Sequence, residues 1–307
     1  MNLSVQLAPK HHRGLLLANP VVTASGTFGY GTEYSHLFDV ERLGAIVTKG
    51  TTLEPRDGNA QPRLVETAGG LLNSIGLQNI GARALIKERA PIWANWRVPV
   101  VVNIAGETVS DYAKLASMLD GVAGISGLEV NISCPNIKAG GAEFGAEPAS
   151  AAKVTAAVRA ATSLPLLVKL TPNTGDIVEV AIAVARAGAD GLSLINTLEG
   201  MAIDINRRRP LLGSVTGGLS GPAVKPVALA MVYEVAGSVG LPVVGCGGIA
   251  TSSDAIEFIM AGASAVQVGT ASLVNPRAAL DVLEGIEGFM AEEGIGDINN
   301  LIGVARR

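Results

Sequence analysis

Residues 166–195, with the sequence LLVKLTPNTGDIVEVAIAVARAGADGLSLI, contain two apolar runs separated by an amphipathic stretch. The two runs, Leu166–Leu170 and Gly191–Ile195, are apolar apart from Lys169 and Ser193, which is typical of strands covered on both faces. Between them, Asp176 is a good helix N-cap and Gly188 is suited to the position just after a helix. The helix would carry one apolar stripe, formed by Ile177, Val180, Ala181 and Val184. This stretch therefore predicts one strand–helix–strand unit with parallel strands.

Working outward, similar apolar runs recur along the whole chain, and a second helix is predicted over Asp254–Ala261, ending at Gly262. The eight predicted strands are Pro20–Ala24, Ala45–Thr48, Pro99–Asn103, Gly127–Asn131, Leu166–Leu170, Gly191–Ile195, Pro242–Gly245 and Ala265–Val268. Eight strands with intervening helices favour a closed barrel over an open sheet. We therefore predict an α/β fold, a (β/α)8 TIM barrel, in a single domain spanning residues 1–307.

Segments outside these units have predicted places on the barrel. Leu3–Gln6 and Gly14–Leu17 precede the first strand and could form a small hairpin over the barrel floor. Thr51–Asn79 and Leu198–Pro222 are too long for simple turns, and both follow a strand, so we expect them on the catalytic face. The glycine-rich Ala139–Gly145 segment is a candidate lid.

Composition narrows the class of protein. The net charge of −4 argues against a nucleic-acid partner, because phosphate binding needs a basic surface, and Arg207–Arg209 suits a solvated loop face. Two cysteines among 307 residues fit a reducing compartment. No uninterrupted apolar run reaches membrane-spanning length, so we expect a cytoplasmic protein without a membrane partner. No Cys/His/Asp cluster has metal-ligand spacing, so no metal site is expected.

Polar side chains and glycines gather at the predicted strand ends, where the active sites of these barrels lie. The polar residues there are Ser25, Lys49, Asn103, Asn131, Lys169, Asn196 and Thr197. Gly247 and Gly248 follow the seventh strand, and Gly269 and Thr270 follow the eighth. Loops at these two places commonly hold phosphate, because glycine lets backbone N–H groups come close to the anion. The sequence therefore predicts a phosphate site beside a lysine-containing ligand site.

The two cysteines have different surroundings. Cys246 reads as a small buried hydrophobe, whereas Cys134 lies in a polar, proline-containing loop after the fourth strand. A thiol at that position could act as a nucleophile or as a general base. The three histidines lie away from the predicted strand ends. This argues against a hydrolase that uses a Cys-His pair or a Ser-His-Asp triad.

These motifs together resemble the dihydroorotate dehydrogenase family. The resemblance rests on NISCPN at Asn131–Asn136, NSIGLQN at Asn73–Asn79, Thr48 with Lys49, Asn196 with Thr197, and the two terminal glycine sites. It covers the chain from about Leu3 to Pro276. Cysteine at position 134 resembles the class 1 enzymes, since class 2 enzymes have serine there and carry an N-terminal extension.

Within class 1, the chain looks most like class 1B, through Thr52–Arg56, Glu66 with Thr67, and Leu77–Asn79. The resemblance implies one FMN per catalytic chain and a second, electron-transfer subunit that holds FAD and a [2Fe-2S] cluster and reduces NAD+. A homodimer of catalytic chains with two electron-transfer subunits, a heterotetramer, is the implied assembly. The implied reaction is oxidation of dihydroorotate to orotate in pyrimidine biosynthesis.

The resemblance also implies residue roles. Cys134 would be the catalytic base at C5 of dihydroorotate, with Lys49 and Lys169 as further catalytic residues. FMN would be held by Ser25, Lys49, Gly50, Asn103, Asn131, Lys169, Ile195, Gly221, Gly247, Gly248, Gly269 and Thr270. Dihydroorotate would be held by Lys49, Asn73, Ser74, Ile75, Gly76, Leu77, Asn131, Asn196 and Thr197.

Two other readings stay open from the sequence. One is a different FMN barrel, either a fumarate-linked class 1A dehydrogenase or a dihydropyrimidine-type oxidoreductase. The other is a flavin-free barrel that serves as a binding subunit. The absorbance of bound flavin and the choice of electron acceptor would discriminate among them.

Overall fold

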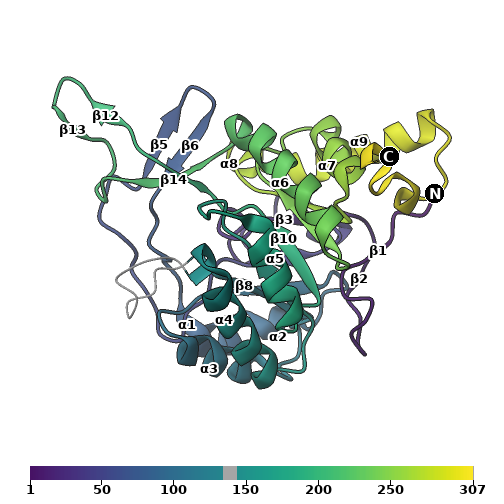
Figure 1. Ribbon diagram of the computed structural model, residues 1–307, viewed down its shortest axis with the longest axis horizontal. Helices are drawn as coiled ribbons and strands as arrows, with labels where there is room; N and C mark the ends of the chain where they lie inside the picture. Colours follow the sequence, from purple (N-terminus) through teal and green to yellow (C-terminus); the bar gives the residue numbers. More distant parts are fainter. Residues whose placement is uncertain (134–143, 307) are drawn as a thin grey trace.

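The computed structural model describes residues 1–133 and 144–306, and these form a closed parallel barrel surrounded by helices (Figure 1). The eight-stranded sheet of the described residues has the order β3-β16-β15-β10-β9-β8-β7-β4. Its strands are β3 (Val21–Thr23), β4 (Ile46–Val47), β7 (Val100–Ile104), β8 (Gly127–Asn131), β9 (Leu166–Lys169), β10 (Gly191–Leu194), β15 (Val243–Cys246) and β16 (Ala265–Val268). A parallel bridge between Val22 and Ala45 joins the two end strands and closes the barrel. The predicted barrel and all eight predicted strands are confirmed.

The helices lie around the outside of this barrel (Figure 1). They are α1 (Gly81–Glu88), α2 (Ala90–Trp93), α3 (Val109–Leu119), α4 (Pro148–Ala161), α5 (Ile177–Arg186), α6 (Lys225–Ser238), α7 (Ser252–Ala261), α8 (Ala271–Val274) and α9 (Ala278–Glu292). The predicted cap of α5 is confirmed, because Asp176 accepts hydrogen bonds from the backbone N–H groups of Val178 and Glu179. Helix α7 starts two residues earlier than predicted, since Thr251 is its N-cap in a reciprocal capping box with Asp254. No helix within the described ranges has the length and apolar character that crossing a bilayer requires.

The N-terminal hairpin covers the amino end of the barrel, as predicted. Strands β1 (Val5–Gln6) and β2 (Leu16–Leu17) pair antiparallel. A Cβ atom on Gly191, the first residue of β10, would lie 2.8 Å from the carbonyl oxygen of Leu7. This close approach shows that the segment around the hairpin packs directly under the strand that begins at Gly191.

The two long connections were expected as loops, but they contain one shared antiparallel sheet with the order β11-β14-β6-β5. The strands are β5 (Leu64–Thr67), β6 (Gly70–Asn73), β11 (Leu198–Gly200) and β14 (Gly217–Ser220). A hairpin of β12 (Ile203–Asp204) and β13 (Arg209–Pro210) extends beyond them on the same side of the barrel (Figure 1). These strands are short, half exposed and rich in glycine, so no apolar run marked them in the sequence.

Candidate active site

The carboxyl ends of the barrel strands bring the predicted polar residues together. Asn131 and Lys169 are register partners on β8 and β9. The Asn196 amide, just after β10, donates a hydrogen bond of 3.2 Å to Asn131 Oδ1. On the other side, a Cβ atom on Gly50 would lie 3.1 Å from Asn103 Oδ1 at the end of β7. Residues from the ends of five strands therefore surround one region at the mouth of the barrel.

A buried polar network fills the barrel just below this mouth, and the sequence analysis did not predict it. The Glu129 side chain is fully buried and accepts hydrogen bonds from Asn103 Nδ2 (2.7 Å), Ser193 Oγ (2.7 Å) and Gln267 Nε2 (2.6 Å). Ser193 and Gln267 lie on β10 and β16, which are not neighbours of β8, so Glu129 reaches them across the barrel interior. A charged residue and an amide inside apolar strands were the available sequence signals.

Lys169 joins this network from above. Its Nζ donates a hydrogen bond of 2.8 Å to Gln267 Oε1 and lies 3.7 Å from Cys246 Sγ. Burial by itself lowers the pKa of Lys169, but electrostatic attraction from Cys246 and Glu129 outweighs burial and raises it. Burial also raises the pKa of the Cys246 thiol, although the nearby Lys169 ammonium opposes that effect.

Lys49, at the end of β4, is a second cation at the mouth. Its side chain is half buried, and its backbone N–H donates to the carbonyl of Gly29. Burial lowers the pKa of Lys49, the Arg63 guanidinium lowers it further, and Glu33 opposes both. The charged form of a partly buried lysine is destabilised until an anion pairs with it. The surroundings of Lys49 therefore favour binding of an anionic ligand.

The predicted phosphate site has the backbone conformations that such a site requires. Gly247 and Gly248, after β15, have φ angles of 126° and 74°, which side-chain-bearing residues rarely adopt. Thr270, after β16, donates a hydrogen bond of 2.8 Å to Ser220 Oγ, and Gly221 beside it has a φ of 96°. The structure thus brings Thr270 into contact with β14 of the antiparallel sheet β11-β14-β6-β5, which we call the upper sheet, whereas Gly248 lies against Lys225 at the start of α6. Ser220 is an additional candidate that was not predicted from the sequence.

The upper sheet positions the predicted substrate residues over the mouth. The Asn73 amide on β6 donates to the carbonyl of Gly218 on β14 (3.2 Å). A Cβ atom on Gly218 would lie 2.0 Å from Thr197 Oγ1, so the missing side chain makes room for Thr197. Further along, Leu77 has a φ of 55° and the buried Ser74 Oγ has no hydrogen-bond partner in the described part of the chain.

Of the remaining predicted residues, the structure describes Ser25, Ile195 and Cys246, whereas Cys134 lies outside the described residues. Ser25 is half buried just after β3, and the buried Ile195 donates its backbone N–H to the carbonyl of Cys246. Cys246 is a buried free thiol, as predicted. Cys134 and positions 139–143 of the candidate lid lie outside the described residues, so the structure tests neither prediction.

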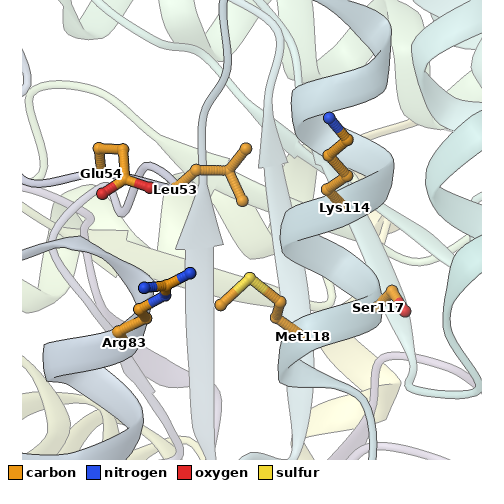
Figure 2. A pocket seen from close by; sticks show the side chains of 6 residues that line it. All are labelled: Leu53, Glu54, Arg83, Lys114, Ser117 and Met118. Carbon is orange, nitrogen blue, oxygen red and sulfur yellow. The ribbon is translucent and has the colours of Figure 1, made fainter.

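One surface pocket lies apart from this site. It is lined by residues before and on helices α1 and α3, on the outside of the barrel (Figure 2), namely Leu53, Glu54, Arg83, Lys114, Ser117 and Met118. None of these residues belongs to the predicted site. The polar groups described above are therefore the candidate active site, independently of this pocket.

Comparison with known proteins assigns the chain to a family. Residues 9–290 match the family model described as Dihydroorotate dehydrogenase. A Trichlorobacter lovleyi protein named "Dihydroorotate dehydrogenase B (NAD(+)), catalytic subunit" is 60% identical over 289 residues, which are 94% of this chain and 95% of that protein. Proteins with the same name from Desulforamulus reducens and Desulforudis audaxviator are 56% and 58% identical, over 99% and 96% of this chain and of each relative. The chain belongs to the dihydroorotate dehydrogenase family.

Proposed function

We propose that this chain is the catalytic subunit of an NAD+-linked dihydroorotate dehydrogenase and oxidises dihydroorotate to orotate in pyrimidine biosynthesis. Family membership and the shared name of relatives at 56–60% identity support this activity. The observation that carries it in the structure is the gathering of polar side chains at the mouth of the barrel, where Asn131 is the register partner of Lys169 and accepts a hydrogen bond from Asn196. These are groups that recognise a small planar anion with amide edges.

FMN is the cofactor that we propose for this site, and the residues present fit it. Asn103 Oδ1 is buried and has no hydrogen-bond partner among the described residues, so it is an acceptor available to a ligand N–H. Lys169 has three N–H groups, and its described contacts use two of them, at Gln267 and Cys246. The positive φ angles of Gly247 and Gly248 let backbone N–H groups approach a phosphate.

The proposed binding residues are those that the resemblance to the family implies. FMN would be held by Ser25, Lys49, Gly50, Asn103, Asn131, Lys169, Ile195, Gly221, Gly247, Gly248, Gly269 and Thr270. The substrate would be held by Lys49, Asn73–Leu77, Asn131, Asn196 and Thr197. When bound, FMN supplies the two-electron acceptor for the hydrogen that leaves C6 of dihydroorotate.

Within this assignment, the residues of the chain have separate roles. Cys134 would remove the proton from C5 of the substrate as its thiolate. Lys169, whose pKa is raised by its neighbours Cys246 and Glu129, would stabilise negative charge that develops at the ligand edge facing it. Asn131 and Asn196, which are hydrogen-bonded to each other, would orient the substrate without adding charge. Lys49 would pair with the substrate carboxylate.

A second subunit completes the proposed enzyme. The relatives are named catalytic subunits, which supports a separate chain for electron transfer to NAD+. We propose that this chain carries FAD and a [2Fe-2S] cluster, in an assembly of two catalytic and two electron-transfer subunits. NAD+ reduction by dihydroorotate should therefore require the second subunit, and efficient fumarate reduction by the isolated chain would instead indicate a class 1A enzyme.

The Cys134→Ala variant tests the proposed chemistry. We expect the variant to retain yellow FMN and to bind orotate, because the base does not hold either molecule. Reduction of its flavin by dihydroorotate should slow by about 10²- to 10⁴-fold, the usual contribution of a general base. Stopped-flow absorbance under anaerobic conditions measures this rate. Unimpaired reduction would remove Cys134 from the mechanism, and a colourless wild-type protein that binds no FMN would refute the function itself.

A further inference from the structure

Glu129 is a carboxylate inside the barrel, and its hydrogen bonds impose an orientation on two amide side chains. The side chains of Asn103, Ser193 and Gln267 all donate hydrogen bonds to its two oxygens. Asn103 therefore presents its Nδ2 to Glu129 Oε1, and Gln267 presents its Nε2 to Glu129 Oε2. Each amide oxygen must then point away from Glu129.

Both amide oxygens point at groups of the candidate site. Gln267 Oε1 accepts the hydrogen bond from Lys169 Nζ. Asn103 Oδ1 lies beside Gly50, buried and without a hydrogen-bond partner in residues 1–133 and 144–306. The Glu129 carboxylate thus has two effects on the candidate site. It leaves Asn103 Oδ1 free as an acceptor, and it turns Gln267 Oε1 toward Lys169 Nζ.

We infer that Glu129 is a positioning residue, which holds Asn103 Oδ1 toward the cofactor as an acceptor and Gln267 Oε1 toward Lys169. The inference rests on the proposed function, because FMN is the molecule that this acceptor would meet. Glu129 is buried under the ring of strand ends and acts through Asn103 and Gln267.

Replacing Glu129 by glutamine keeps the shape of the side chain but turns one of its oxygens into a donor. If the new NH2 group faces Asn103, the Asn103 amide must flip and present a donor to the ligand in place of an acceptor. If it faces Gln267, that amide must flip and present its NH2 group to Lys169 Nζ. Either arrangement disrupts one half of the site.

A double exchange should restore the match. In the variant Glu129→Gln with Asn103→Asp, glutamine can donate to the new carboxylate at the position where Glu129 Oε1 accepts now. Its amide oxygen can still accept from Ser193 and Gln267, as Glu129 Oε2 does. The second oxygen of the aspartate then remains an acceptor beside Gly50, and the network keeps its overall charge.

The test is titration of the flavin-stripped full-length chain with FMN, followed by the quenching of FMN fluorescence. We expect the Kd for FMN to rise at least about tenfold in Glu129→Gln and in Asn103→Asp, and to return to within about threefold of the wild-type value in the double variant. Ser193→Ala is the matched control, because it removes a hydrogen bond from the same carboxylate and reverses neither amide. Its Kd should stay within about threefold of the wild-type value.

The double variant decides the outcome even if a single variant does not fold. A double variant that folds and binds FMN more tightly than either single variant supports the inference, including the case in which a single variant is unfolded. Wild-type affinity in Glu129→Gln, or a double variant no better than the single ones, overturns it. Failure of the wild-type chain itself to bind FMN would refute the proposed function instead.

Discussion

At the scale of single residues, the proposed role of Lys49 makes ligand binding depend on pH. Burial and the neighbouring Arg63 lower its pKa below the ordinary 10.5, although Glu33 opposes them. A carboxylate ligand needs the ammonium form, so its affinity is full below the pKa of Lys49 and is lost as the pH rises through it. The lowered pKa moves this loss to a lower pH than for an exposed lysine.

We therefore predict that orotate binding weakens in alkaline solution with a midpoint below 10.5. Lys49→Arg should retain affinity to higher pH, since a guanidinium stays charged throughout this range. The measurement is the Kd of orotate, from the change in flavin absorbance, at a series of pH values. Titration of orotate itself is common to both proteins, so an identical alkaline loss in wild type and variant would contradict the role of Lys49.

At the scale of secondary-structure elements, the upper antiparallel sheet holds the proposed substrate residues by close packing. Strands β11 and β14 pair with each other, and β14 also pairs with β6, which carries Asn73. Thr197 occupies the space that a side chain at position 218 would need, so only glycine fits there. The sheet therefore connects two segments far apart in the sequence, and Thr197 packs against Gly218 of one of them.

Gly218→Ala should displace Thr197, because the added Cβ would lie 2.0 Å from its Oγ1. Overpacking of this kind typically costs about 1–3 kcal/mol, so we expect orotate binding to weaken by about tenfold while FMN binding is retained. Gly200→Ala on β11 is the control, since its Cβ would meet the movable end of the Leu72 side chain at 3.1 Å. Equal effects of the two variants on the Kd of orotate would refute the specific role of Gly218.

At the scale of the whole molecule, one hydrophobic core runs from Val5 to Leu301. The two ends of the described chain also lie close together (Figure 1). Asn2 Nδ2 donates a hydrogen bond of 3.0 Å to Asp297 Oδ2, near the C-terminal end. Because this core is continuous, the buried side chains of the two halves of the chain belong to one cluster and do not form two separate cores. The single domain over residues 1–307 remains a prediction that unfolding can test.

We expect one cooperative unfolding transition by differential scanning calorimetry, both without FMN and with it. FMN would bind the folded state of the chain and not the unfolded state. A free FMN concentration of about 100 times its Kd should therefore add about 2.7 kcal/mol to the free energy of unfolding. Riboflavin, which lacks the phosphate, is the control and should stabilise less. Two separate transitions, with FMN shifting one of them, would show that the chain contains two domains.

Much of this structure was predictable because its determinants are local. Parallel strands buried on both faces leave continuous apolar runs, and the cap at Asp176 depends on neighbours two and three residues away. Polar residues that end such runs, among them Lys49 and Lys169, must meet at one end of a barrel whatever the details of its packing. The sequence by itself therefore determined the barrel and which polar residues gather at the carboxyl ends of its strands.

What the tertiary structure decided are contacts between residues far apart in the chain. Glu129 and Gln267 are 138 positions apart, and their pairing depends on which strands face each other across a closed barrel. The upper sheet likewise forms because the connections that contain β6 and β14 lie on the same side of the barrel. No local sequence pattern predicts that these two strands pair. Such contacts are set by the path of the whole chain, since a side chain inside a barrel meets partners that only closure of the sheet brings within reach.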